Sequence, residues 1–149
     1  MIIYVYTDGA SRSNPGKSAS GYQLLDWKGR VIARESFYNG IKTNNQAEYL
    51  ALIKALQKAS EYGSDAELRI YSDSQLMVNQ LKGTYKTRDS DLKKLNEEAS
   101  ALLSRFGSFS LSSVSREDRH IAEVDRALNE LLDRMEGMRD GKTGKQEAL

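Results

Sequence analysis

The sequence predicts an α/β fold in which helices flank one five-stranded mixed sheet. Three observations indicate this class: a β-branched and aromatic segment near the start, two further strand segments joined by a tight turn, and later strands that alternate with helices. A hairpin meander followed by strand–helix alternation implies antiparallel strands on one side of the sheet and parallel strands on the other. Ligand sites in such sheets lie at the carboxyl ends of the parallel strands.

The first part of the chain supplies the meander, with strands expected at residues 2–7, 21–26 and 30–37. Residues 2–7 are apolar enough for a strand that is buried on both faces. Gly29 supplies the turn between the second and third strands. A helix then begins after Thr43 or Asn44, either of which can cap it, and runs to about Tyr62, with Gly63 just beyond its end.

The second part alternates helices and strands, with strands at 66–72 and 109–114 and helices at 74–82, 90–106 and 121–135. Gly83 ends the second helix and Ser90 caps the third, in which apolar residues recur at helical spacing. Residues 136–149 contain three glycines and little that is apolar, so they are expected to form a disordered tail after a single domain of residues 1–135.

The composition restricts the chemistry. The 149 residues include no cysteine and one histidine, which excludes thiol nucleophiles, cysteine-ligated metals and multi-histidine metal centres. Any metal would therefore be a hard cation held by carboxylate oxygens. No apolar run reaches the ~20 residues that a membrane-spanning helix needs, and no signal peptide is recognisable. We expect a cytoplasmic monomer without membrane contact.

Two aspartates follow neighbouring strands of the predicted sheet. Asp8 ends the first strand and Asp73 ends the fourth, so in a parallel pair their carboxylates project at the same edge. The alternative for each is a cap of the following turn or helix.

Two more acids lie on the apolar sides of predicted helices. Glu48 shares a helix face with Leu52 and Ala55, and its alternative is a first-turn glutamate that leans into solvent. Asp125 lies beside Leu128 on the last helix, and its alternative is an ion pair with a neighbouring arginine such as Arg126.

Together these four acids predict a cage of oxygen ligands. Two carboxylates at ~5 Å repel each other by about 3 kcal/mol at an effective dielectric of ~20, and divalent cations remove that repulsion. Mg²⁺ suits such a site because it binds carboxylates and keeps waters for a substrate. A pair of metals ~4 Å apart would clamp the attacking and leaving oxygens of a phosphodiester.

The motifs around these acids occur in the order of a known family. They are Thr7-Asp8-Gly9-Ala10-Ser11, Asn14-Pro15-Gly16, Thr43-Asn44-Asn45-Gln46-Ala47-Glu48, Ser72-Asp73-Ser74-Gln75, Val114-Ser115-Arg116-Glu117 and Val124-Asp125-Arg126-Ala127-Leu128-Asn129. Each motif alone is weak, but the ordered series is specific. Over residues 1 to about 135 the chain resembles a type 1 ribonuclease H, in the compact form that lacks a basic protrusion and a separate hybrid-binding domain.

The resemblance implies an RNase H-like fold and an endoribonuclease that hydrolyses the RNA strand of an RNA/DNA hybrid, leaving 3′-hydroxyl and 5′-phosphate ends. It implies a catalytic domain over residues 1–135 and two Mg²⁺ ions per active site, with Mn²⁺ as a substitute. The implied metal-binding and catalytic carboxylates are Asp8, Glu48, Asp73 and Asp125.

The resemblance also implies a substrate-binding set. Asn14, Asn44 and Gln75 would contact the hybrid beside the scissile bond, where an amide can both donate to and accept from a 2′-hydroxyl. Thr43 and Asn45 belong to the same set, although each can instead serve the cap of its own helix. For Asn14 the alternative is an ordinary Asn-Pro turn.

Three features carry weaker assignments. Lys86 and Arg88 lie in a basic stretch with Lys82, Lys93 and Lys94, which either contacts phosphates or simply faces water. His120 and Arg116 both precede Asp125, and either fits the auxiliary proton-transfer or product-release residue that many relatives carry in this loop. An exposed residue at a helix start is the alternative for His120.

Two other functions compete with the hybrid nuclease. One keeps the carboxylates but acts on DNA, as a nuclease or resolvase, or on double-stranded RNA, because fold does not fix function. The other is a non-catalytic nucleic-acid-binding module with a decayed site, against which the presence of all four acids argues.

Overall fold

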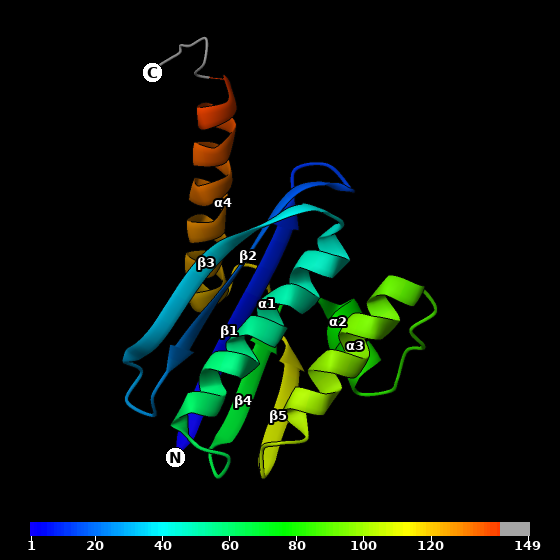
Figure 1. Cartoon of the computed structure of the whole chain (residues 1–149). Coiled ribbons are helices and arrows are strands. Elements are labelled where there is room, and N and C mark those ends of the chain that lie inside the picture. Colours follow the sequence, from blue (N-terminus) through cyan, green and yellow to red (C-terminus); the bar gives the residue numbers. More distant parts are fainter. Residues whose placement is uncertain (141–149) are drawn as a thin grey trace.

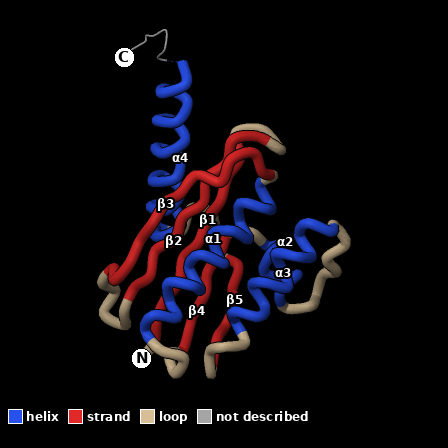
Figure 2. Tube along the Cα trace, in the orientation of Figure 1, coloured by secondary structure: helices blue, strands red, loops and turns tan. Residues whose placement is uncertain are grey.

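The computed structural model describes residues 1–140 and contains one five-stranded sheet in the order β3-β2-β1-β4-β5 (Figures 1 and 2). Its elements are β1 (Ile2–Ser11), β2 (Gly16–Leu25), β3 (Val31–Lys42), α1 (Asn44–Ala59), a 3₁₀ turn (Ser60–Tyr62), β4 (Glu67–Ser72), α2 (Gln75–Leu81), α3 (Ser90–Leu103), β5 (Ser108–Ser113) and α4 (Arg119–Asp140). The predicted fold class and order of elements are confirmed.

The central strand, β1, joins the antiparallel and parallel halves of the sheet. It pairs antiparallel with β2 as far as Ser11, but its parallel pairing with β4 ends where Thr7 meets Ser72. Asp8 therefore does not end the first strand as predicted, since β1 continues for three more residues on its antiparallel side. Asp8 and Asp73 nevertheless both follow the last parallel pair directly.

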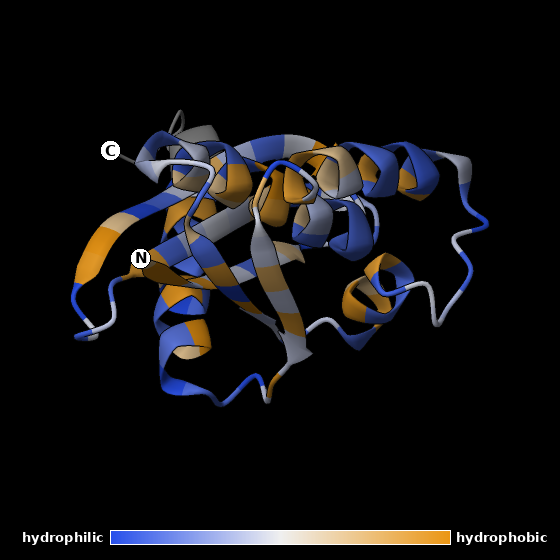
Figure 3. Ribbon diagram, turned by 90° about the horizontal axis from the view of Figure 1, so that it is seen from below, coloured by the Kyte–Doolittle hydropathy of each residue, from blue (hydrophilic) through white to orange (hydrophobic). Residues whose placement is uncertain are grey.

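Helices cover both faces of the sheet (Figure 3). Ile3 and Val5 of β1 are fully buried in the larger core, which α1 and α3 complete. On the other face Tyr6 and Ala10 pack against a smaller cluster that α4 supplies through residues such as Leu128. This two-faced burial explains why residues 2–7 lack an alternating apolar pattern.

The strands of the meander are longer than predicted. The additional residues, 16–20 in β2 and 38–42 in β3, are mostly small or polar and have low intrinsic strand propensity. Tertiary contacts hold them in place: Ser20 Oγ donates a hydrogen bond of 2.6 Å to the carbonyl of Ala47 in α1, and Asn39 Nδ2 donates to Ser20 Oγ at 2.7 Å. Small residues are needed here because helices pack closely on both faces.

The last helix is also longer than predicted, since α4 runs from Arg119 to Asp140 and projects beyond the edge of the sheet (Figure 1). The prediction of a disordered tail from residue 136 is therefore wrong for residues 136–140, where Glu136 is held by an ion pair with Arg12. The rest of that predicted tail, 141–149, lies outside the described residues. Within residues 1–140, no helix has the length and apolarity that crossing a bilayer requires.

Candidate active site

Three carboxylates meet at the carboxyl end of the parallel strands. Asp8 comes from β1, Glu48 from α1 and Asp73 from the turn after β4, and each offers an oxygen within 4.8 Å of the others. The paired ends of β1 and β4 bring the two aspartates together, as the strand pattern predicted. This arrangement has the residue types and spacing of a site for a divalent cation.

The position of Glu48 depends on a glycine in the neighbouring strand. A Cβ atom on Gly9 would lie 2.4 Å from the carbonyl carbon of Ala47 and 2.6 Å from the backbone nitrogen of Glu48. Only glycine therefore lets the first turns of α1 approach β1 this closely. Glu48 is 9% exposed, so the alternative of a solvent-facing first-turn glutamate is wrong.

Other residues perform the capping that Asp73 was a candidate for. Ser74 is the N-cap of α2, and its hydroxyl accepts a hydrogen bond of 3.1 Å from the backbone N–H of Met77. Ser72 Oγ accepts a bond of 3.0 Å from the N–H of Ser74. Asp73 thus lies between two capping serines, and its carboxylate is left for the cluster.

The cluster is electrostatically strained. Burial, reinforced by the charges of Asp73 and Asp125, raises the pKa of Asp8 to about 9, although the backbone N–H of Gly9 opposes the rise. Burial and the charges of Asp8 and Asp73 likewise raise the pKa of Glu48. A positive charge placed among these carboxylates would favour the ionised forms of Asp8 and Glu48.

Two oxygens of the cluster have unused bonding capacity. Within residues 1–140, Glu48 Oε1 and Asp73 Oδ1 are buried without a hydrogen-bond partner, as is Thr7 Oγ1 nearby in the sequence. A buried polar atom without a partner is costly unless a ligand satisfies it. Unsatisfied carboxylate oxygens on residues of this cluster fit a hard cation.

Asp125 lies beside this cluster rather than inside it. It is close enough to raise the pKa of Asp8 through a hydrogen bond and through its charge, but it is not among the three residues whose oxygens converge. Its Oδ1 accepts a hydrogen bond of 3.0 Å from Asn129 Nδ2. The ion pairs of residues 1–140 do not include one with Arg126, which was the structural alternative.

The two predicted asparagines lock the loops beside the cluster together. Asn14 Oδ1 accepts a hydrogen bond of 3.0 Å from the backbone N–H of Asn44, and Asn44 Oδ1 accepts one of 2.8 Å from the N–H of Ser11. Backbone N–H groups can only donate, so they fix both amides with oxygen inward. We expected these amides both to donate to and to accept from a substrate. Because their oxygens are already occupied, only their NH₂ groups are left, and these can only donate.

The other predicted binding residues have different roles. Thr43 is the N-cap of α1 and forms a reciprocal capping box with Gln46, whose side chain accepts from the Thr43 N–H at 2.8 Å. Asn45 is exposed in the first turn of α1 and is not the cap. Gln75 is the exposed first residue of α2, two residues after Asp73.

His120 and Arg116 lie in different environments. His120 packs on Tyr6, with ring centroids 4.6 Å apart, and its Nδ1 lies 3.4 Å from both Glu123 Oε1 and Gln23 Nε2. Tyr6 lies two residues before Asp8 in β1, and the contacts of His120 are with Tyr6, Glu123 and Gln23. Arg116 is exposed in the loop before α4.

The two basic candidates lie elsewhere. Lys86 and Arg88 are exposed in the loop between α2 and α3, on the side of the molecule where α3 packs against α1 (Figure 1). They do not belong to the carboxylate cluster, and their exposure is compatible with either phosphate contact or simple solvation.

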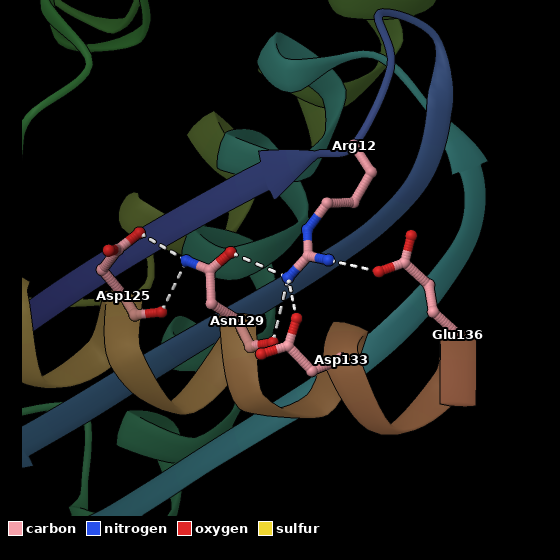
Figure 4. Close-up of polar contacts among 5 residues, drawn as sticks. All are labelled: Arg12, Asp125, Asn129, Asp133 and Glu136. Carbon is pink, nitrogen blue, oxygen red and sulfur yellow. Dashed lines mark hydrogen bonds and ion pairs between the residues drawn. The ribbon is translucent and has the colours of Figure 1, made fainter. Parts of the chain in front are cut away.

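The sequence analysis missed two residues that connect to Asp125. Arg12, in the turn after β1, and Asn129, one helical turn after Asp125, form a hydrogen-bonded chain with it (Figure 4). The spacing of four residues from Asp125 to Asn129 was a usable signal, since such pairs face each other on a helix. No sequence signal connects Arg12 with residues more than a hundred positions away.

Comparisons with known proteins point in one direction. The model of the family described as "Reverse transcriptase-like" matches residues 6–124. The chain is 41% identical over 131 residues to a ribonuclease HI of Halobacterium salinarum, covering 88% of this chain and 64% of that protein. It is 36% identical over 136 residues to a bifunctional protein of Mycobacterium tuberculosis, of which it spans 36%.

Solved structures agree with these sequence matches. The crystal structure of RNase H1 from Halobacterium salinarum has a TM-score of 0.81 and 41% identity, covering 90% of this chain and 99% of that one. The structure of LC11-RNase H1 in complex with an RNA/DNA hybrid has a TM-score of 0.83 and 34% identity, with coverages of 89% and 98%.

Proposed function

The chain belongs to the type 1 ribonuclease H family, and from this we propose that it is an endoribonuclease that hydrolyses the RNA strand of RNA/DNA hybrids, leaving 3′-hydroxyl and 5′-phosphate ends. The observation that carries the proposal is the buried cluster of Asp8, Glu48 and Asp73. The cluster lies in a domain whose structural match covers 98% of the RNase H1 chain solved with an RNA/DNA hybrid.

The cluster would hold divalent cations, for which we propose two Mg²⁺ ions with Mn²⁺ as a substitute. Glu48 Oε1 and Asp73 Oδ1 lack hydrogen-bond partners within residues 1–140, so we propose them as the first metal ligands. Asp8, whose charge acts on Glu48, and Asp125, whose charge acts on Asp8, would complete the set. When bound, the cations supply charge stabilisation for the attacking and leaving oxygens of a phosphodiester. The carboxylates then ionise together without mutual repulsion.

The loops around the cluster would hold the hybrid. With their oxygens bound to backbone N–H groups, Asn14 and Asn44 present NH₂ donors, and Gln75 is exposed two residues after Asp73. Such donors suit the 2′-hydroxyl and sugar oxygens that line the wide, shallow minor groove. We propose that either His120 or Arg116 assists proton transfer. Comparing His120→Ala with Arg116→Ala would identify which one, because the variant of the assisting residue should lose more kcat.

The decisive experiment offers the protein three duplexes of one sequence: RNA/DNA, DNA/DNA and RNA/RNA, each with Mg²⁺ or Mn²⁺. We expect cleavage of the RNA strand of the hybrid alone. Asp73→Asn should abolish it, whereas Glu98→Gln, which removes an exposed acid on α3, should not. Comparable cleavage of DNA/DNA or RNA/RNA would favour the other nucleases, and binding without any cleavage would favour a non-catalytic module.

We also propose a domain boundary, an oligomeric state and a location. The catalytic domain extends to Asp140 rather than 135, because α4 is continuous to that residue. We propose a monomeric enzyme, because one chain supplies all four carboxylates, and we propose that it acts in the cytoplasm. Sedimentation of the purified protein would test the monomer, and a dimer at micromolar concentration would contradict it.

A further inference from the structure

Asn129 stands between Asp125 and Arg12 in a chain of hydrogen bonds (Figure 4). Its Nδ2 donates to Asp125 Oδ1 at 3.0 Å and to the Asp125 backbone carbonyl at 2.9 Å. Its Oδ1 accepts from Arg12 Nη2 at 3.2 Å, and its backbone carbonyl accepts from the same nitrogen at 3.0 Å. One side-chain amide therefore connects the turn after β1 to a carboxylate on α4.

Arg12 helps to hold this amide in one orientation. A guanidinium can only donate hydrogen bonds, so the atom of Asn129 that faces it must be the oxygen. The NH₂ group is then directed at Asp125. When ionised, the Asp125 carboxylate has no proton to donate and can only accept hydrogen bonds. The Asp125 backbone carbonyl, which also only accepts, favours the same orientation, and Arg12 adds contacts that hold the amide in it from the turn after β1.

Arg12 is itself held from the far end of α4. Its Nη2 lies 2.9 Å from Asp133 Oδ1, and its Nη1 pairs with Glu136. Three groups along one helix face thus position a single guanidinium, whose side chain is 29% exposed. The two ion pairs are partly exposed and add little stability on their own, so geometry is their main contribution.

We propose that Arg12 and Asn129 are positioning residues that fix the carboxylate of Asp125 beside Asp8, a role that rests on the function proposed above. Asn129 occupies Asp125 Oδ1 and leaves the other oxygen available to the carboxylate cluster. The hydrogen bond that holds Asn14, from the backbone N–H of Asn44, does not involve Arg12, so the loop proposed to contact the hybrid has its own anchor.

The test compares Arg12→Met, Asn129→Leu and the double variant with Arg134→Met, which removes an exposed arginine from the same helix. We expect each single variant to lower kcat on the hybrid by about 10- to 100-fold, as is typical when a residue that orients a metal-site ligand is lost. KM should change by less than about twofold, because the hybrid contacts stay in place. Arg134→Met should behave as the wild type.

The double variant separates this role from general stabilisation. Because Arg12 acts through Asn129, the double variant should lose no more kcat than Asn129→Leu alone, whereas independent effects would multiply. Asp133→Asn/Glu136→Gln removes both ion pairs but keeps the Arg12–Asn129 contact. It should lower the melting temperature as much as Arg12→Met does, with a smaller loss of kcat.

A readout without substrate keeps the test independent of activity. Calorimetric titration with Mn²⁺ alone should show weaker binding for Arg12→Met and Asn129→Leu than for Arg134→Met. Unchanged Mn²⁺ affinity together with unchanged kcat, a rise in KM alone, or multiplicative losses in the double variant would each overturn the proposal. A wild type that binds Mn²⁺ but spares the hybrid would instead refute the proposed function. Asn129→Ser repeats the test if the leucine variant does not fold.

Discussion

At the scale of single residues, the protein keeps three acids in a place that is unfavourable for their charges. Asp8 and Glu48 are almost fully buried, and their raised pKa values reflect both lost hydration and mutual repulsion. An arrangement that costs stability is informative, because nothing in the packing of the core requires it. A cation that binds only the native state would offset this loss of stability, because such binding stabilises the native state.

This conflict predicts that Asp8→Asn stabilises the metal-free protein, and by more at pH 9 than at pH 5. The pKa of Asp8 is raised from 3.8 to about 9 in the native state. Between pH 3.8 and about pH 9, Asp8 is therefore protonated in the native state and ionised in the unfolded state. The free energy of unfolding therefore falls as the pH rises through this window. Asparagine does not titrate in this range, so the free energy of unfolding of the variant does not fall for this reason.

The measurement is thermal unfolding of both proteins in EDTA at pH 5, 7 and 9. The gain at pH 9 should approach about 3 kcal/mol, the repulsion of one ionised pair at ~5 Å and an effective dielectric of ~20. Catalysis should be lost at every pH. A difference in stability that does not vary with pH would contradict the argument.

A second prediction follows from the oxygens without partners. We expect 1 mM Mg²⁺ to raise the melting temperature of the wild type and to raise that of Asp73→Asn much less, because the amide has no negative charge and only one oxygen to offer the cation. A ligand at 100 times its dissociation constant stabilises by about 2.7 kcal/mol, which sets the scale. Asp91→Asn, an exposed acid in α3, is the matched control. Equal shifts in the three proteins would place the Mg²⁺ effect outside the cluster.

The sequence predicted the carboxylates better than their surroundings. Glu48 was recognisable because a charged residue on an apolar helix face needs a reason to be there. The orientation of the Asn14 and Asn44 amides was not recognisable, because it depends on backbone N–H groups from loops that only the fold brings together. Arg12 was missed for the same reason.

At the scale of elements, the site depends on how closely α1 approaches β1. The backbone of Ala47 and Glu48 lies where a side chain on Gly9 would be. Helix and strand are thus in direct backbone contact at the point where Glu48 enters the cluster. The glycine of the Thr7-Asp8-Gly9 motif is therefore a packing requirement.

Gly9→Ala is therefore expected to destabilise the protein by about 1–3 kcal/mol, the range for overpacking a well-packed contact. Because α1 must move, Glu48 should leave the cluster and kcat should fall as well. Chemical denaturation and a hybrid-cleavage assay measure the two effects.

Gly137→Ala provides the opposite control. A Cβ at Gly137 in α4 meets nothing within 4 Å, so alanine there should stabilise by about 0.5–1 kcal/mol through helix propensity. Destabilisation by both substitutions, or by neither, would show that the close approach of α1 is not the cause.

Element types were predictable and element ends were not. Each strand and α-helix of residues 1–140 overlaps a predicted segment, which came from apolar spacing for α3, from composition for β1 and from caps and glycines for α1 and α2. The far ends of β2 and β3 carry serine, glycine and asparagine, whose strand conformation depends on bonds such as that of Ser20 to Ala47. Near the end of α4, Glu136 forms an ion pair with Arg12, a contact that no local pattern reveals.

At the scale of the whole molecule, the charge is nearly balanced, with 22 basic and 21 acidic residues and a net charge of +1. Affinity for a polyanion must then come from the cations in the cluster, a few amide donors and local basic groups. We expect the salt dependence of hybrid binding to be shallow.

Lys86→Gln and Arg88→Gln test whether the α2–α3 loop takes part. If these side chains contact phosphates, each substitution should reduce the slope of log affinity against log salt by about 0.7–0.9. Lys28→Gln, in the exposed turn between β2 and β3, is the charge-matched control and should leave the slope unchanged. Identical slopes in all proteins would mean that the basic loop only faces water.

The position of β1 in the middle of the sheet also dictates when the site can assemble during folding. The antiparallel meander needs only residues 2–42, whereas the parallel pairing with β4 must wait until α1 has crossed the sheet. Asp8 is therefore in place early, Glu48 and Asp73 join it later, and Asp125 arrives with the final helix. On a ribosome the repelling charges would meet only after most of the core that must withstand them has been synthesised.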